Sequence, residues 1–179
     1  MNEIKLHTPL NKKQTQDLRC GDRVLITGTI YSARDAAHMR LLKELSEGKE
    51  PPFNLQGSII YYAGPSPARP ENISGSFGPT TSGRMDNMTI PLLERGVMGM
   101  IGKGNRRKDV IESIVLNQAV YFAAIGGAGA LIANSVKSIE IIAYNDLGAE
   151  AIMKIEVENF PVFVAIDTLG NNIYNNGQK

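Results

Sequence analysis

The residues best suited to chemistry lie in one segment, residues 78–86, which reads GPTTSGRMD. Its hydroxyls, its flexible backbone and its guanidinium come from Thr80, Thr81, Gly83 and Arg84. A loop of this kind brings main-chain N–H groups and a planar arginine fork close to an anion. We therefore predict an anion-binding loop. The alternative is an ordinary polar loop that caps the helix after it.

A second group lies at residues 31–38, YSARDAAH, where a strong strand pattern passes into a helical one. Open α/β sheets bind ligands at such places, beyond the carboxyl ends of their strands. Arg34 can hold a carboxylate with two parallel N–H groups, and His38 follows one helical turn later, so both are expected to face one site. The alternative is a surface pair of Arg34 with Asp35 and a half-buried, structural His38.

Lys103 lies between two glycines in residues 102–108, GKGNRRK, after a short apolar run. It has little to pack against and is free to reach an anion, although a solvated basic loop is the alternative. Residues 126–130, GGAGA, are similar to a phosphate-binding helix start but lack the full G-x-G-x-x-G pattern. Close packing of helix on sheet is the favoured interpretation there, and a non-catalytic phosphate- or nucleotide-binding module remains an alternative function.

These segments together offer several cations with few acids nearby, which predicts a small polycarboxylate as the ligand. The cations are Arg34, Arg84 and Lys103, and the accompanying hydroxyls are those of Thr80 and Thr81. All of them follow predicted strands or lie in loops. Residues 64–86 form a long irregular connection, and connections of that length are usually functional when they are ordered.

The elements that must position these residues alternate along the chain. Alternating and continuous apolar runs predict strands at residues 4–10, 23–31, 58–63, 97–101, 120–125, 139–144, 152–158 and 162–167. Helical spacing predicts helices at residues 15–19, 35–48, 86–96, 108–118 and 127–136, with Val110, Ile114 and Leu116 facing inward. Residues 168–174 are expected to turn back. We predict one mixed α/β domain over residues 1–179, parallel at its centre, with antiparallel strands added at both ends.

Composition limits the possible partners and cofactors. The 179 residues have a formal net charge of +1, so a broad nucleic-acid-binding surface is not expected. The N-terminus lacks the apolar core of a signal peptide, and no apolar run reaches membrane-spanning length. A cytoplasmic protein without membrane or nucleic-acid partners follows. One cysteine, Cys20, and two histidines cannot build a four-cysteine cluster or an ordinary zinc site, so no metal site is predicted.

Four segments in this order, TGTIYSARDAAH, GPTTSGRMD, MIGKG and GGAGALI, resemble the β subunit of the iron–sulfur-dependent class I fumarases and tartrate dehydratases. The resemblance runs from Leu18 to the C-terminus and includes the later stretch NDLGAEAIMKIEVENFPVFVAIDTLG. It implies an α/β fold, the swivelling β/β/α domain with a mixed sheet and flanking helices. It also implies a hydro-lyase, with fumarate hydratase as the first reading and tartrate dehydratase as the alternative.

The same resemblance implies a partner, a separate α subunit that holds a [4Fe–4S] cluster through three cysteines, in a heterotetramer with the active site between the chains. No cofactor is expected in this chain. The resemblance assigns substrate contacts to Arg34, Arg84 and Lys103, with Thr81 and Gly83 beside them. It assigns the proton transfer to Thr80. His38 matches the family's RD-x-x-H pattern and is a second catalytic candidate beside Thr80, with its exact role left open.

The implied reaction suits these residue types. Dehydration of a 2-hydroxy dicarboxylate removes a weakly acidic proton and expels hydroxide, which the open iron of the partner's cluster would assist as a Lewis acid. The cations would stabilise the charge that builds on the substrate's carboxylate. A threonine is a weak base, so Thr80 would need nearby cations or a relay through His38 or a partner acid.

Overall fold

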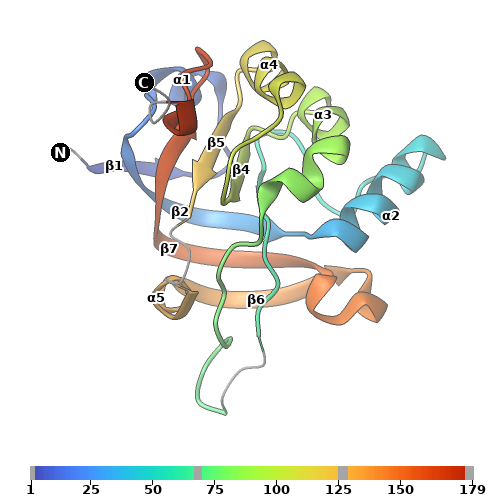
Figure 1. Ribbon diagram of the computed structural model, residues 1–179. Coiled ribbons are helices and arrows are strands. Elements are labelled where there is room, and N and C mark those ends of the chain that lie inside the picture. Colours follow the sequence, from blue (N-terminus) through green and yellow to red (C-terminus); the bar gives the residue numbers. More distant parts are fainter. Residues whose placement is uncertain (1–2, 67–69, 125–128, 176–179) are drawn as a thin grey trace.

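Two long antiparallel strands organise the backbone. In the computed structural model, which describes residues 3–66, 70–124 and 129–175, β2 (Arg23–Ser32) pairs with β7 (Ile152–Ile166) along its whole length. Figure 1 shows them as two ribbons that cross the molecule side by side, with β6 (Val136–Ala143) below. Residues of β2 alternate between the two faces of the sheet, as expected for a strand rich in Val, Ile and Thr.

The other strands complete one seven-stranded sheet in the order β1-β2-β3-β4-β5-β7-β6. These are β1 (Glu3–His7), β3 (Ile59–Tyr61), β4 (Gly99–Gly102) and β5 (Val120–Ala123). From β1 to β5 all neighbours are parallel, whereas β7 is antiparallel to β2, β5 and β6. Since β7 pairs with both β5 and β2, strands β2, β3, β4, β5 and β7 close into a ring.

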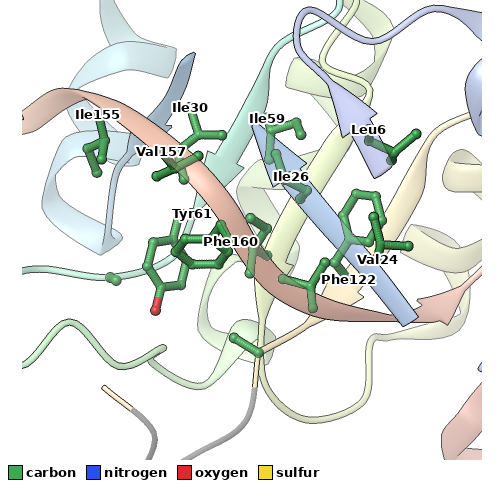
Figure 2. Close-up of a cluster of buried hydrophobic side chains, with 14 of the residues drawn as sticks. Leu6, Val24, Ile26, Ile30, Ile59, Tyr61, Phe122, Ile155, Val157 and Phe160 are labelled. Atoms are coloured by element: carbon green, nitrogen blue, oxygen red, sulfur yellow. The ribbon is translucent and has the colours of Figure 1, made fainter. Parts of the chain in front are cut away.

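Apolar side chains fill both sides of the short parallel strands. One cluster lies inside the ring and is shown in Figure 2, where side chains such as Ile26, Tyr61 and Phe160 point toward one another. A second cluster lies between the sheet and the helices α2 (Asp35–Ser46), α3 (Asp86–Glu94) and α4 (Lys108–Leu116). Strands β3 to β5 are therefore buried on both faces, as is usual for parallel strands. The mixed sheet with flanking helices predicted from the sequence is confirmed.

The remaining elements are short. They are α1 (Lys12–Asp17), α5 (Gly129–Asn134) and the 3₁₀ turns η1 (Ser82–Met85), η2 (Asn145–Glu150) and η3 (Ile173–Asn175). Between β3 and η1 no helix or strand is formed by residues 62–66 and 70–80, as expected from the sequence, and the described part of this connection extends below β6 in Figure 1. Phe77 anchors its return, since it is fully buried and its carbonyl accepts a hydrogen bond from the Tyr61 hydroxyl.

Three expectations about these elements are wrong. The first strand is parallel to β2, because α1 lies between them and makes a crossover rather than a hairpin. Residues 152–158 and 162–167 form one strand, β7, whose break in pattern is a β-bulge at Asn159, where φ is +53°. Leu116 is 81% exposed, because a residue two positions after the buried Ile114 points to the other side of a helix.

The glycine-rich segment 126–130 falls mostly outside the described residues, as does the predicted start of the helix at residues 127–136. Helix α5 and strand β6 follow it, and Val136, expected in the helix, begins the strand.

Candidate functional site

The carboxyl ends of three neighbouring parallel strands meet at one edge of the sheet. Ser32 at the end of β2 pairs with Tyr61 of β3, and Tyr61 pairs with Ile101 of β4. Arg34 follows β2 by two residues, and Lys103 directly follows β4. Both predicted cations therefore leave the sheet at the same edge, the one where open α/β sheets bind their ligands.

The loop of residues 78–84 returns to this edge and lies against the end of β4. The N–H of Thr80 donates to the carbonyl of Tyr62 over 2.7 Å, and Thr81 forms a parallel bridge with Lys103. The N–H of Ser82 donates to the carbonyl of Lys103 over 3.0 Å. The structure thus brings the threonine pair and the lysine together, with Thr80 half-buried and both Thr81 and Lys103 exposed.

A glycine allows this close approach. A Cβ atom on Gly102 would lie 1.8 Å from the Ser82 hydroxyl oxygen, so no other residue fits there without moving the loop. Gly83 is exposed at the turn between Ser82 and Arg84, and a Cβ atom there would meet nothing nearby in the described chain.

The two arginines already contact carboxylates. Arg84 donates through Nη2 to Asp35 Oδ2, which ties η1 to the first residue of α2. Arg34 Nε lies 3.8 Å from Glu150 Oε1. The expectation of few acids nearby is therefore wrong. The alternative, a surface pair of Arg34 with Asp35, is not observed either, since Arg34 lies near Glu150 and Asp35 bonds to Arg84. Glu150 comes from η2, far away in the sequence, so local inspection could not have found it.

His38 does not face the exposed edge together with the Arg34 side chain. It is only 1% exposed and its ring packs edge-on against Tyr62, with 5.5 Å between ring centroids. Nδ1 lies 2.8 Å from the carbonyl oxygen of Arg34. Burial lowers the pKa of His38 to about 4, against the opposing effect of the hydrogen bond to Arg34, and the nearby Arg106 cation lowers it further.

A buried ion pair beneath the loops was missed from the sequence, where Arg106 counted as part of a solvated basic loop. The Arg106 side chain has no exposed surface, and its Nε donates to Asp86 Oδ1 over 2.6 Å. Its guanidinium lies between the rings of Tyr62 and Tyr121 and donates through Nη2 to Thr89 Oγ1 over 2.7 Å. Asp86, the acidic residue that ends the GRMD sequence and begins α3, was the one sequence signal for a buried partner of Arg106.

Tyr121 joins the two loops from below. Its hydroxyl lies 2.7 Å from Ser82 Oγ and 2.8 Å from the carbonyl oxygen of Gly104. Asp86 also accepts the N–H of Arg107 over 3.0 Å. The loop that carries Thr80 and the loop that carries Lys103 therefore rest on the same buried hydrogen-bond network.

The single cysteine lies at the other end of β2. The N–H of Cys20 donates to Asp167 Oδ2 over 3.0 Å, and burial raises the pKa of its thiol, with Asp167 and Asp22 adding to the shift. Among residues 3–66, 70–124 and 129–175, no three His, Cys, Asp or Glu side chains are grouped to hold a metal ion. Nor does any described helix have the length and apolar character needed to cross a membrane.

Unfilled hydrogen bonds gather at the junction of β2 and α2. Within the described part of the chain, five buried side-chain atoms lack a hydrogen-bond partner, and four of them belong to residues 32–38. They are Ser32 Oγ, Arg34 Nε, Asp35 Oδ1 and His38 Nε2. Most buried polar atoms in proteins have hydrogen-bond partners, so within the described chain this junction is the part whose buried polar atoms are least satisfied.

Comparisons with known proteins relate the chain to one family and to two kinds of enzyme. Residues 1–177 match the family model described as Fumarase C-terminus. The chain is 39% identical over 176 residues to "Putative L(+)-tartrate dehydratase subunit beta" of Methanocaldococcus jannaschii, a match that covers 95% of this chain and 90% of that protein.

Two fumarate hydratases match at similar identity. The anaerobic class I fumarate hydratase of Escherichia coli (strain K12) is 40% identical over 177 residues, and fumarate hydratase 2 of Leishmania major is 38% identical over 176 residues. Each match covers 96% of this chain but only 32% and 31% of the respective relative. The chain thus spans about a third of these enzymes and nearly all of the dehydratase subunit.

Proposed function

Because this chain belongs to the fumarase C-terminus family, we propose that it is the β subunit of an iron–sulfur hydro-lyase, a fumarate hydratase that interconverts fumarate and malate with a separate α subunit. One observation carries the proposal. Thr80 and Arg84 come from one segment, Arg34 and Lys103 from two others, and the three segments gather at the carboxyl edge of β2 to β4. That set of groups suits a small dicarboxylate whose carbon-bound proton must move.

We further propose that residues 1–179 form one domain of the swivelling β/β/α type. The support is the layering of the described elements. Strands β2, β7 and β6 form one layer, the short strands β3 to β5 form the next, and helices α2, α3 and α4 cover them (Figure 1).

A separate α subunit is proposed because this chain covers nearly all of a relative described as a subunit beta, but about a third of the fumarate hydratases. The residues present do not fit a [4Fe–4S] cluster. Such clusters need several thiolates, and the one cysteine, Cys20, whose main-chain N–H donates to Asp167, lies at the end of β2 away from Arg34. We assign the cluster to the α subunit, and the assembly to a symmetric dimer of heterodimers, a heterotetramer.

Within this chain, the cations bind and orient the substrate. Asp35 occupies one N–H group of Arg84 and leaves the other donors of the guanidinium for a substrate carboxylate. Lys103 and Arg84 are exposed at the edge, where they can meet a ligand held between two chains. Positive charge at fixed positions stabilises the anion that forms as the carbon-bound proton leaves.

Thr80 is proposed to take or return that proton, with Thr81 and Gly83 shaping the loop around the substrate. The hydrogen bond from the Thr80 N–H to Tyr62 fixes its main chain. Nearby cations favour the deprotonated form of a hydroxyl, and Lys103 pairs with Thr81, the residue next to Thr80. His38 is assigned a different role, since its ring is buried and its Nδ1 is engaged by the Arg34 carbonyl.

The test is an anaerobic assay of this chain co-expressed with a cluster-bearing α subunit, with malate, fumarate and the tartrate isomers as substrates. We expect the highest kcat/KM with malate and fumarate. Dehydration of a tartrate isomer alone would establish the second candidate, tartrate dehydratase, which the 90% coverage of a dehydratase subunit favours. A pair inactive on all four, with nucleotide binding by this chain, would replace both with a binding module.

A further inference from the structure

The main chain of Arg34 is fixed at the start of α2 by two contacts with His38. Its carbonyl oxygen accepts the N–H of His38 over 2.9 Å, and the His38 ring nitrogen Nδ1 lies 2.8 Å from the same oxygen. A carbonyl can only accept, so Nδ1 carries the proton. In the neutral ring Nε2 is then unprotonated, and it has no partner in the described part of the chain.

The imidazole that makes this bond cannot turn freely. It is 1% exposed and packs against Tyr62, whose own hydroxyl lies 3.4 Å from both Thr89 Oγ1 and Arg106 Nη2. The polar and charged groups around the ring are the Arg34 carbonyl, Asp35, Tyr62 and Arg106. With one cation nearby and little water, the ring stays neutral through the pH range in which the enzyme is expected to work.

The Arg34 side chain is constrained from two further directions. A Cβ atom on Gly64 would lie 3.4 Å from Arg34 Cδ, so the stem of the arginine lies against this glycine. On the other side, Glu150 Oε1 lies 3.8 Å from Nε. Nε itself is buried and makes no hydrogen bond within the described residues, so its position is set by packing and charge and by the main chain to which it is attached.

We propose that His38 is a positioning residue for Arg34, which it fixes as a neutral imidazole with the proton on Nδ1, so that the guanidinium is presented before substrate arrives. The inference rests on the proposed function, because it takes Arg34 to bind a substrate carboxylate. A group held in place in advance loses less freedom on binding, and accurate placement also favours the chemical step.

Three variants test the role in the assembled enzyme. His38→Phe keeps a ring and removes the donor, His38→Asn keeps an N–H group near Nδ1, and His7→Phe changes an exposed histidine as the control. We expect His38→Phe to raise KM about 5- to 10-fold, the effect of one lost hydrogen bond, and to lower kcat less. His38→Asn should recover most of the loss with an unchanged pH profile of kcat/KM. Equal and severe loss of kcat in both His38 variants would instead make His38 the base.

A second measurement needs no activity. In ¹⁵N spectra of the wild-type pair, His38 should show the neutral Nδ1–H form from pH 5.5 to 8.5, with the signals of the two histidines separated by the His7 variant. The Arg34 Nε signal should shift or broaden in His38→Phe and stay unchanged in His7→Phe. A protonated Nε2, a charged ring within this range, or an Arg34 signal indifferent to His38→Phe would overturn the proposal, even if the substrate assignment were also wrong.

Discussion

Both ends of β2 carry a group of buried polar side chains, and the two groups differ in how their hydrogen bonds are filled. At the first end, the fully buried Asp167 accepts the N–H groups of Cys20, Leu169 and Asn171 and the Asn171 side-chain amide, each over 2.9 or 3.0 Å. At the other end, four buried side-chain atoms of residues 32–38, named above, have no hydrogen-bond partner in the described chain.

The difference separates stability from function along one strand. A buried carboxylate with all its bonds made ties β7 to the turn before β2 and stabilises the fold. A buried polar atom without a bond contributes no such stabilisation, so the atoms near Arg34 and Asp35 do not support the fold as Asp167 does. Ten residues of strand hold the two groups about 30 Å apart, so substitutions at one end should leave the other unchanged.

The largest effect is expected for Thr80→Val, which keeps the shape of the side chain and removes the hydroxyl. In the assembled enzyme kcat should fall by about 10²- to 10⁴-fold, the usual contribution of a proton-transfer group, with KM within a few fold. Exchange of the substrate's carbon-bound proton with solvent should slow equally. Exchange at the wild-type rate would exclude Thr80 as the base. The unfolding midpoint should not change.

Asp86→Ala should weaken the fold beneath the functional end. It leaves the fully buried Arg106 without its ion-pair partner, which costs about 3–5 kcal/mol of unfolding free energy. Denaturant unfolding of the isolated chain measures this loss. The matched control is Asp109→Ala, which removes an acid from the exposed pair with Arg107 and should cost less than about 1 kcal/mol. Similar losses in the two variants would mean that the Arg106 network is not a structural base.

Arg84→Lys should lower kcat/KM by about 10- to 100-fold, because lysine keeps the charge but loses the planar fork that matches a carboxylate. Arg23→Lys is the control at the other end of the strand. Arg23 is 51% exposed and pairs with Glu3, and Arg84 is 53% exposed and pairs with Asp35. Steady-state kinetics of the two variants, each assembled with the α subunit, measures the difference in kcat/KM. Equal activity of the two variants would remove Arg84 from the substrate site.

Asp167→Asn should lower the unfolding free energy by about 1–3 kcal/mol at pH 7, with kcat/KM of the assembled enzyme unchanged. Burial alone would raise the pKa of Asp167, but the Asn171 amide and the N–H groups of Cys20, Asn171 and Leu169 outweigh it and lower the pKa. The charged form is therefore favoured in the folded chain. Its stabilisation is present above the carboxyl's unfolded pKa and lost as pH falls through the lower, folded value.

The check is unfolding of wild type and Asp167→Asn at pH 7 and at pH 3. The difference in unfolding free energy between the two proteins should shrink at the lower pH. A constant difference would mean that the charge of Asp167 contributes nothing to the unfolding free energy. A loss of enzyme activity in Asp167→Asn would mean that the two ends of β2 are not independent.

Local sequence predicted most of the helices and strands, and it placed two of the cations directly after strands. The Val, Ile and Thr pattern predicted β2, and Asp35 marked the start of α2. Strands separated by helices predicted a parallel arrangement, and parallel neighbours place residues that follow them, such as Arg34 and Lys103, at one edge.

Side-chain pairings between residues far apart in the sequence could not be predicted from local patterns. Glu150 reaches Arg34, and Asp86 buries Arg106, through contacts that depend on how the sheet closes. A solvated basic loop was the alternative interpretation of residues 102–108, but the two neighbouring arginines there differ in burial. Arg106 is enclosed by two tyrosine rings, whereas Arg107 stays exposed. Composition alone does not distinguish them.

The most direct test of the central claim is dicarboxylate binding at the unfilled end of β2. Succinate, a dicarboxylate with no hydroxyl to lose, is titrated into the assembled pair with this chain labelled with ¹⁵N, and the arginine Nε and main-chain N–H signals are followed. The account predicts saturable shifts of the Arg34 and Arg84 Nε signals, and no shift of the N–H signals of Cys20 and Asn171. Unchanged arginine signals at saturating succinate, or equal shifts at both ends, would contradict it.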